Sequence, residues 1–190
     1  HAMVNALEAN DVYIRGHSER VTVLSIMLGK MIGLDSEDLK IIRYGAILHD
    51  LGKIGIDYTV LNKIEPLTSS EYDLIKQHPV IGAKIIRPIG FPVPVNEIII
   101  QHHEWYNGDG YPYGLTSDHI SPLARIVTIA DAYDAMTSKR AYRKYLEPSE
   151  ARQEVMNKTG TQFDPEYGKI FCNYYPQIIE PVSDSPSIQN

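Results

Sequence analysis

The sequence predicts an all-α protein with a single domain. Apolar residues recur three and four positions apart along most of the chain, which is the spacing of one face of a helix. Several of these segments follow a residue that commonly caps a helix, or begin with a proline. The length of 190 residues corresponds to about one domain and suffices to bury an apolar core.

Two helices are expected in the N-terminal part of the chain. The first is marked by apolar side chains that share one face: Val21, Leu24, Met27, Leu28 and Met31. We expect Gly33 to end this helix. The second helix opens at Asp35 or Ser36 and runs to about Asp50, before Gly52 breaks the pattern.

Three further helices are expected in the middle of the chain. Residues 68–71, Thr-Ser-Ser-Glu, have the spacing of a capping box, so a helix begins there. Pro79 cannot donate a backbone hydrogen bond and therefore starts a new helix over residues 80–86, with His78 at the junction. Another helix covers about residues 95–103.

A loop and three more helices complete the predicted fold. Residues 107–114 hold three glycines and one proline, a composition typical of a loop. The pair Ser121-Pro122, a cap followed by a first-turn proline, begins a helix that runs to about Ser138. Pro148 and Pro165 begin the last two.

The composition excludes several classes of protein. A formal net charge of -6 argues against a general nucleic-acid binder, which usually carries a basic excess. Cys172 is the only cysteine, so no disulfide forms within the chain and a reducing, cytoplasmic setting is expected. The apolar stretches fall short of the roughly 20 residues that a spanning helix needs, so we expect no membrane segment in this chain. We interpret residues 1–3 as a cloning remnant.

Histidines and aspartates form the pattern that points to chemistry. The set comprises His17, His49, Asp50, His78, His102, His103 and Asp131. Neutral imidazoles with carboxylates suit divalent ions such as iron, manganese, zinc or nickel. Adjacent residues on a helix point about 100° apart, so His49 and Asp50 are placed to serve neighbouring ions. A shared carboxylate is what a hydrolytic pair of metals about 3.5–4 Å apart needs.

The order of the motifs resembles that of the HD-GYP domains, bacterial phosphodiesterases of the HD superfamily that cleave cyclic di-GMP. The motifs that carry the resemblance are His49-Asp50-Leu51-Gly52-Lys53, His102-His103-Glu104 and Gly108-Asp109-Gly110-Tyr111-Pro112. The resemblance extends from about Asp11 to Tyr175. It implies a helical bundle with a glycine-rich GYP loop, in a domain over residues 4–180. We expect residues 181–190 to form a flexible tail.

The resemblance also implies a dinuclear metal centre. One ion would be held by His17, His49, Asp50 and Asp131, and the other by Asp50, His78, His102 and His103. Asp50 would bridge the two ions and so belong to the catalytic centre. Some members of the family hold a third ion through a glutamate at the position of Tyr13, which is a poor ligand. We therefore predict two ions, with iron or manganese favoured over zinc or nickel.

A mechanism follows from the resemblance. A metal-bridging hydroxide would attack phosphorus and convert cyclic di-GMP to linear pGpG, and the sequence leaves open whether pGpG or GMP is the final product. Lys53 would neutralise a phosphate oxygen in the transition state, and Arg140 and Arg143 would grip phosphates or guanine edges. Asp134 would support a ligand or assist proton transfer to the leaving oxygen. Tyr111 would stack on a guanine or pack to hold the loop.

Two other functions stay open. One is hydrolysis of a different substrate, for instance 3′,3′-cyclic GMP-AMP. The other is that of a weakly active module that senses a cyclic dinucleotide or binds a partner. The resemblance implies that the GYP loop contacts a signalling partner, such as a diguanylate cyclase domain. We expect regulatory domains to lie outside this sequence.

Overall fold

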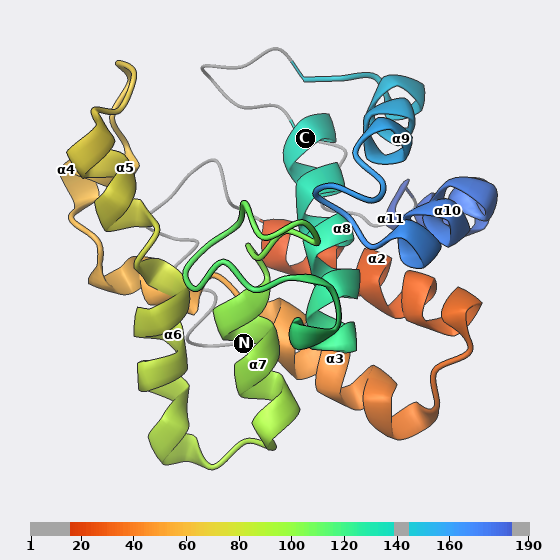
Figure 1. The fold of residues 1–190 in the computed structure, drawn as a ribbon, viewed down its shortest axis with the longest axis horizontal. Helices are drawn as coiled ribbons and strands as arrows, with labels where there is room; N and C mark the ends of the chain where they lie inside the picture. Colours follow the sequence, from red (N-terminus) through yellow and green to blue (C-terminus); the bar gives the residue numbers. More distant parts are fainter. Residues whose placement is uncertain (1–15, 139–144, 184–190) are drawn as a thin grey trace.

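The computed structural model describes residues 16–138 and 145–183 (Figure 1). Within these residues the regular structure is helical, and the chain pairs with itself in an extended form only at two isolated bridges. The prediction of an all-α fold is confirmed. None of the described helices is long and apolar enough to cross a membrane.

The described part of the chain forms α-helices joined by loops and short 3-10 helices. The α-helices are α2 (His17–Ile32), α3 (Ser36–Leu48), α4 (Tyr58–Leu61), α5 (Ser69–Ile75), α6 (His78–Ile86), α7 (Val93–Gln101), α8 (Pro122–Thr137), α9 (Pro148–Asn157), α10 (Pro165–Asn173) and α11 (Tyr175–Ser183). The 3-10 helices are η1 (Leu51–Gly55), η2 (Arg87–Ile89) and η3 (Ser117–His119).

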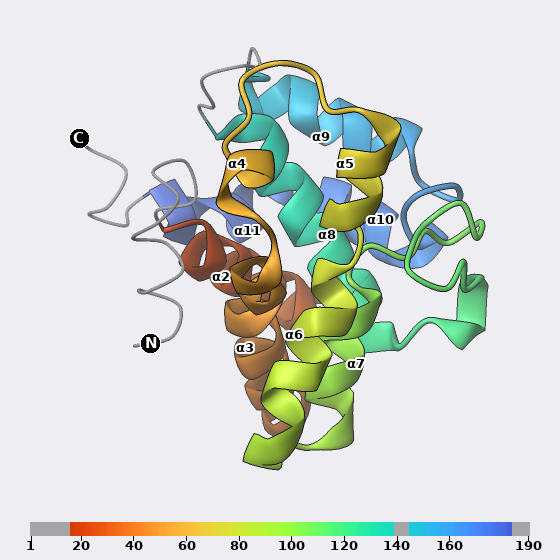
Figure 2. The ribbon, with the colours of Figure 1, turned by 90° about the vertical axis from the view of Figure 1, so that its left-hand side faces the viewer.

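Helix α8 lies at the centre of the bundle, with α6 and α7 to one side and α9, α10 and α11 to the other (Figure 1). Helices α4 and α5 pack on each other and project beyond the end of α6 (Figure 2). The larger core cluster joins α2, α3 and α8 to the C-terminal helices, and a smaller one joins α3, η1, α6 and α7. Elements of both clusters supply the candidate metal ligands, so the ligands meet where the two halves of the bundle meet.

Local signals place several helix ends where the sequence predicts them. Gly33 follows α2 in the left-handed conformation, and its N–H group donates to the carbonyl oxygens of Gly29 and Lys30 in the last turn of that helix. The Asp35 side chain accepts the N–H groups of Glu37 and Asp38 at the start of α3. A capping box joins Thr68 and Glu71 at the start of α5. Each of these contacts spans a few residues, which is why the sequence reveals it.

Other boundaries differ from the prediction. Helix α7 ends at Gln101 rather than at residue 103. The Ser121 side chain makes no capping bond; its backbone N–H instead donates to Gln101 Oε1 at 2.7 Å. Helices α4 and α11 were not predicted, and α11 continues through Pro181 to Ser183, beyond the expected start of the tail. Ile178 of α11 is fully buried in the larger core, so this helix is anchored by packing against distant residues.

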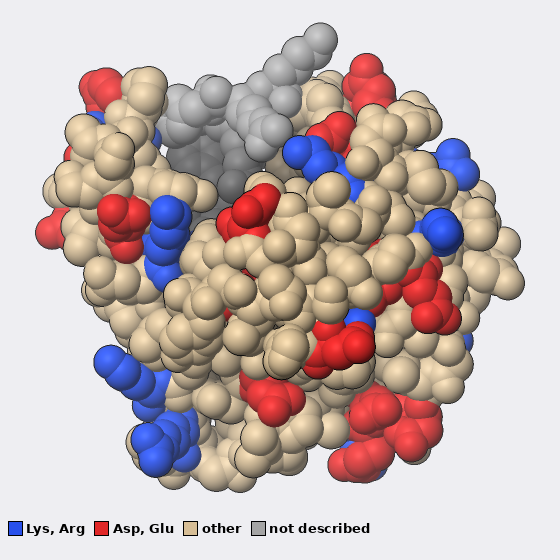
Figure 3. All heavy atoms as spheres, in the orientation of Figure 1, with Lys and Arg blue, Asp and Glu red and all other residues tan. Residues whose placement is uncertain are grey.

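Charged side chains are interspersed on the face shown in Figure 3, and the described residues form no continuous basic patch there.

Candidate metal centre

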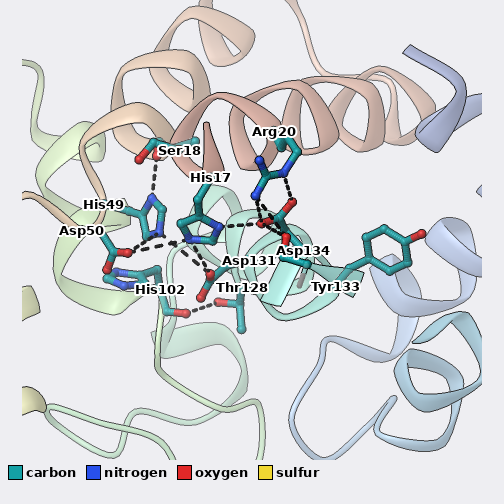
Figure 4. Close-up of polar contacts among 12 residues, drawn as sticks. His17, Ser18, Arg20, His49, Asp50, His102, Thr128, Asp131, Tyr133 and Asp134 are labelled. Carbon is teal, nitrogen blue, oxygen red and sulfur yellow. Dashed lines mark hydrogen bonds and ion pairs between the residues drawn. The ribbon is translucent and has the colours of Figure 1, made fainter. Parts of the chain in front are cut away.

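Two groups of histidine and aspartate side chains meet in the interior. Figure 4 shows four of their members, His17, His49, Asp50 and His102. The His17 group consists of His17, His49 and Asp50, and the His78 group of Asp50, His78, His102 and His103. In each group, one potential ligand atom per residue lies within 4.8 Å of the others. Asp50 belongs to both groups, and all members except His103 are buried. Two buried groups that share a carboxylate indicate a dinuclear metal site.

The ligands come from the ends of helices rather than from their middles. His17 and His78 are the first residues of α2 and α6, whereas His49 and His102 directly follow α3 and α7. Asp131, on α8, is the exception.

The approach of η1 to α6 depends on two glycines. A Cβ on Gly52 would overlap the His78 carbonyl oxygen and lie 2.5 Å from Gly82 N. Gly82 in turn has the Gly52 backbone within contact distance of its own Cβ position. The absence of side chains at these two positions lets η1 pack against α6, where Asp50 Oδ1 lies 3.3 Å from His78 Nε2.

Three of the imidazoles are oriented by the main chain. The Nδ1 atoms of His49, His78 and His102 donate to the carbonyl oxygens three residues earlier, at 2.6, 2.8 and 2.8 Å. A carbonyl oxygen can only accept, so the proton of each neutral ring is on Nδ1 and the Nε2 lone pair is free for a metal.

These lone pairs show that the site fits a cation. The Nε2 atoms of His78 and His102 lie 3.2 Å apart, and both are acceptors. The Nε2 atom of His49 is buried and has no hydrogen-bond partner. An orphaned buried acceptor costs about 1–3 kcal/mol, which a bound divalent ion would recover.

The two oxygens of Asp50 face different groups. Oδ1 lies 3.3 Å from His78 Nε2, whereas Oδ2 lies 3.5 Å from His49 Nε2 and 3.7 Å from His17 Nε2. This is the arrangement of a carboxylate that bridges two ions.

Asp131 closes the His17 group from α8. Its Oδ1 lies 3.3 Å from His17 Nε2 and 3.9 Å from His49 Nε2, and its Oδ2 lies 4.0 Å from His103 Nδ1. All seven side chains that the sequence indicated as ligands therefore gather in one place.

The electrostatics keep Asp50, Asp131, His78 and His103 in the protonation states that a metal requires. Burial raises the pKa of Asp50, but Lys53 and the neighbouring histidines outweigh it and hold that pKa well below its usual value. Burial opposes ionisation of Asp131 too, yet a hydrogen bond from His17 lowers its pKa. Burial lowers the pKa of His78 to about 3 and that of His103 to about 4, so both imidazoles are neutral near pH 7.

Comparison with known proteins places the chain in a family. A family model described as "HD domain" matches residues 1–167. The chain belongs to the HD domain family. It is of the HD-GYP type, homologous to bacterial cyclic di-GMP phosphodiesterases.

Relatives and solved structures of this family resemble the chain over most of its length. It is 35% identical over 91% of its residues to a protein of Thermotoga maritima named "Cyclic di-GMP phosphodiesterase", and covers 48% of that protein. It is 31% identical over 84% of its residues to "3'3'-cGAMP-specific phosphodiesterase 3" of Vibrio cholerae, and covers 35% of it. The structure of an HD-GYP-type protein, Bd1817 of Bdellovibrio bacteriovorus, superposes with a TM-score of 0.70 at 27% identity, covering 84% of this chain and 51% of that one. The chain thus spans about half the length of these proteins, or less.

The other residues indicated by the sequence take different places in this HD-GYP domain. Lys53 Nζ donates to Asp50 Oδ2 at 2.6 Å and lies at the edge of the centre. Asp134 contacts the ligand His17 on the side opposite the centre, where it accepts from His17 Nδ1 at 2.6 Å (Figure 4). The Tyr111 ring packs on that of His103, with centroids 4.7 Å apart, and the Tyr111 N–H donates to the His103 carbonyl. The predictions for Tyr13, Arg140 and Arg143 concern positions outside the described residues.

Two further residues support the HD-GYP centre, and the sequence did not assign a role to either. Glu104 is buried, and its two oxygens accept the N–H groups of Tyr113 and Leu115 at 2.7 and 2.9 Å, which fixes the GYP loop. Its position directly after His102-His103 was the one feature of the sequence that pointed to a role near the centre. Arg20 contacts Asp134 from α2, and no local pattern indicates this contact between distant residues.

Metal binding at the two groups is expected to depend differently on pH. In the metal-free protein, burial lowers the pKa of His17, but hydrogen bonds with Asp131 and Asp134 outweigh it and raise the pKa to about 9. An ion must therefore displace a proton from His17 near pH 7, whereas His78 and His103 are already neutral. We expect affinity at the His17 group to rise about tenfold per pH unit between about pH 7 and pH 9.

Affinity at the His78 group should stay nearly constant over the same range. Calorimetric titration with manganese(II) in two buffers of different ionisation enthalpy counts the displaced protons. An equal pH dependence at both groups would contradict the proton assignment to His17.

Proposed function

We propose that this HD-GYP domain is a metal-dependent phosphodiesterase that hydrolyses cyclic di-GMP to linear pGpG, with further hydrolysis to GMP left to the assay below. The observation that carries the proposal is the pair of buried groups that share Asp50, with Lys53 at their edge. The relative from Thermotoga maritima, 35% identical and named for cyclic di-GMP, supports this substrate.

The ligand sets would follow the two groups. One ion would be held by His17, His49, Asp50 and Asp131, and the other by Asp50, His78, His102 and His103. Two bound divalent ions, which we propose to be iron or manganese, supply Lewis acidity and lower the pKa of water so that it can act as a nucleophile near neutral pH.

The other side chains of the domain position the substrate and support the ligands. Lys53 places a positive charge where negative charge develops on a phosphate oxygen. Asp134 is engaged by His17 and Arg20, an arrangement that favours support of the ligand over proton transfer. The ring contact of Tyr111 with His103 favours a role in holding the loop. We assign Arg140 and Arg143 to the phosphates or guanine edges, because guanidinium forks suit them.

The proposal includes a protein partner at the GYP loop, such as a diguanylate cyclase domain. Tyr113 in this loop is 60% exposed, and Glu104 holds the surrounding backbone in place. An exposed aromatic side chain on a fixed loop is a suitable anchor for another protein.

A second substrate, 3′,3′-cyclic GMP-AMP, is the alternative. It is favoured by the Vibrio cholerae relative, 31% identical and named for that nucleotide. A sensing module with little turnover is less well supported, because a receptor does not need all seven ligand side chains.

The test is anaerobic reconstitution with iron(II) or manganese(II), followed by metal analysis and hydrolysis on the same sample. Two ions per chain and release of pGpG, with cyclic di-GMP preferred over cyclic GMP-AMP in competition, are expected. Preference for cyclic GMP-AMP would show that this nucleotide, rather than cyclic di-GMP, is the substrate. Two ions and tight binding without product would indicate a sensor, and fewer than two ions would contradict the ligand sets.

Lys53→Met is expected to lower kcat by about 100-fold while both ions stay bound, because the side chain acts on charge in the transition state. Metal content and single-turnover rates, measured on one preparation, separate the two effects. Loss of metal from this variant would show that Lys53 supports Asp50 rather than the substrate.

A further inference from the structure

We infer that Arg20 is a positioning residue for the metal ligand His17, acting through Asp134. This inference rests on the proposed metal-dependent function. It concerns a side chain that lies outside both ligand groups and reaches them through one carboxylate.

The guanidinium of Arg20 grips both oxygens of Asp134 (Figure 4). Nε donates to Oδ1 at 2.6 Å, and Nη2 donates to Oδ2 at 3.0 Å and also to Ser138 Oγ at 3.0 Å. The Arg20 side chain is 15% exposed and that of Asp134 is 4% exposed. A two-pronged bond of this kind fixes the plane of the carboxylate as well as its position.

The fixed carboxylate in turn orients His17. Asp134 Oδ2 accepts from His17 Nδ1 at 2.6 Å, so the opposite ring atom, Nε2, points toward Asp131 and Asp50. His17 and Arg20 are three residues apart on α2 and therefore share a helix face. Both side chains therefore bond the carboxylate of Asp134, which lies opposite this face on α8.

His17 differs from the other buried imidazoles in what holds it. His49, His78 and His102 each bond a carbonyl three residues earlier, in the last turn of a preceding helix. His17 is the first residue of α2 and follows Gly16, so its Nδ1 uses the Asp134 side chain instead. The orientation of His17 is therefore open to side-chain substitution, and that of the other three is not.

A purely structural pair between α2 and α8 would also explain the contact between Arg20 and Asp134. The chain offers a matched control for this reading. Arg125 Nη1 donates to Asp164 Oδ2 at 2.7 Å, and these side chains are 12% and 6% exposed. This pair joins α8 to the start of α10 and contacts no candidate ligand. If burial of an Arg–Asp pair alone matters, the two arginines should behave alike.

The experiment compares wild-type protein with Arg20→Ala, Arg20→Lys and Arg125→Ala, each as the full chain. Manganese(II) is titrated against a competing chelator, and spin coupling between paired ions is followed by electron paramagnetic resonance. We expect Arg20→Ala to keep one ion at wild-type affinity, to bind the other about 10–100-fold more weakly, and to lose the coupled signal. Arg20→Lys keeps the positive charge but cannot bond both carboxylate oxygens, so its affinity for the second ion should lie between those of wild type and Arg20→Ala. Millimolar methylguanidinium should restore binding of the second ion in Arg20→Ala.

Arg125→Ala should bind two ions as the wild type does, although its melting temperature falls at least as much. Two ions of wild-type affinity in Arg20→Ala, or in Arg20→Lys if the alanine variant does not fold, would overturn the inference and leave the proposed function standing. Wild-type protein that binds two ions but hydrolyses no cyclic dinucleotide would overturn the proposed function alone. Equal weakening of both ions would also overturn the inference, because it would show a general loss of structure.

Discussion

Asp50→Asn is expected to lose both metal ions and to lower hydrolysis by more than the roughly 100-fold that loss of a supporting partner costs. One carboxylate faces both groups, with Oδ1 3.3 Å from His78 Nε2 and Oδ2 3.5 Å from His49 Nε2. An amide is neutral and offers a single acceptor oxygen, so it cannot bridge two cations. It also removes the partner of the Lys53 ammonium, 2.6 Å from Oδ2.

Metal analysis after reconstitution, together with the rate of phosphodiester cleavage, checks this expectation. The matched control is Asp118→Asn, because the Asp118 side chain is 94% exposed and belongs to neither group. The control should keep both ions and wild-type turnover. An Asp50→Asn protein that retains one ion and substantial activity would show that the two groups bind metal independently.

Gly52→Ala is the second substitution with a large expected effect. The new methyl group would overlap the His78 carbonyl oxygen, and neither backbone can yield without moving η1 away from α6. Overpacking of this kind costs about 1–3 kcal/mol, and more where only backbone surrounds the site. Because Asp50 and Lys53 stand on η1 or next to it, and His78 begins α6, the same shift should weaken metal binding at the His78 group.

Chemical denaturation and metal titration of the same variant measure both effects. Gly90→Ala is the control, because Gly90 has a φ of 78° and no atom within 4 Å of its Cβ position. It should cost only the roughly 1–2 kcal/mol of a left-handed backbone and leave metal content unchanged. A Gly52→Ala protein with wild-type stability would mean that η1 and α6 can separate without cost.

The sequence predicts those parts of the molecule that depend on neighbouring residues. The cap at Asp35, the capping box at Thr68 and the glycine after α2 each act over a few positions, and the structure has all three. Helices α4 and α11 were not predicted; α4 is four residues long, and Ile178 of α11 is buried in the larger core, a contact with distant residues that the local sequence does not reveal.

The candidate site was predictable as a set of residue types but not as a geometry. The order of the histidines and aspartates indicated seven ligands, and the structure brings all seven together. Arg20 and Asp134 lie 114 positions apart, so only the fold reveals their contact. The role of Glu104 needed the path of the loop, because its bonds go to backbone N–H groups rather than to a recognisable partner.

The backbone bonds of His49, His78 and His102 have a consequence for how such a protein can change over generations. Every residue type has a carbonyl, so substitutions at positions 46, 75 and 99 that preserve the helices leave an acceptor in place for each ring. Residues on the surface and even in the core of these helices can therefore be substituted while the three imidazole rings keep their orientation. Diversification for new substrates is free to proceed around an unchanged centre, and the contact that must be inherited intact is the one among His17, Asp134 and Arg20.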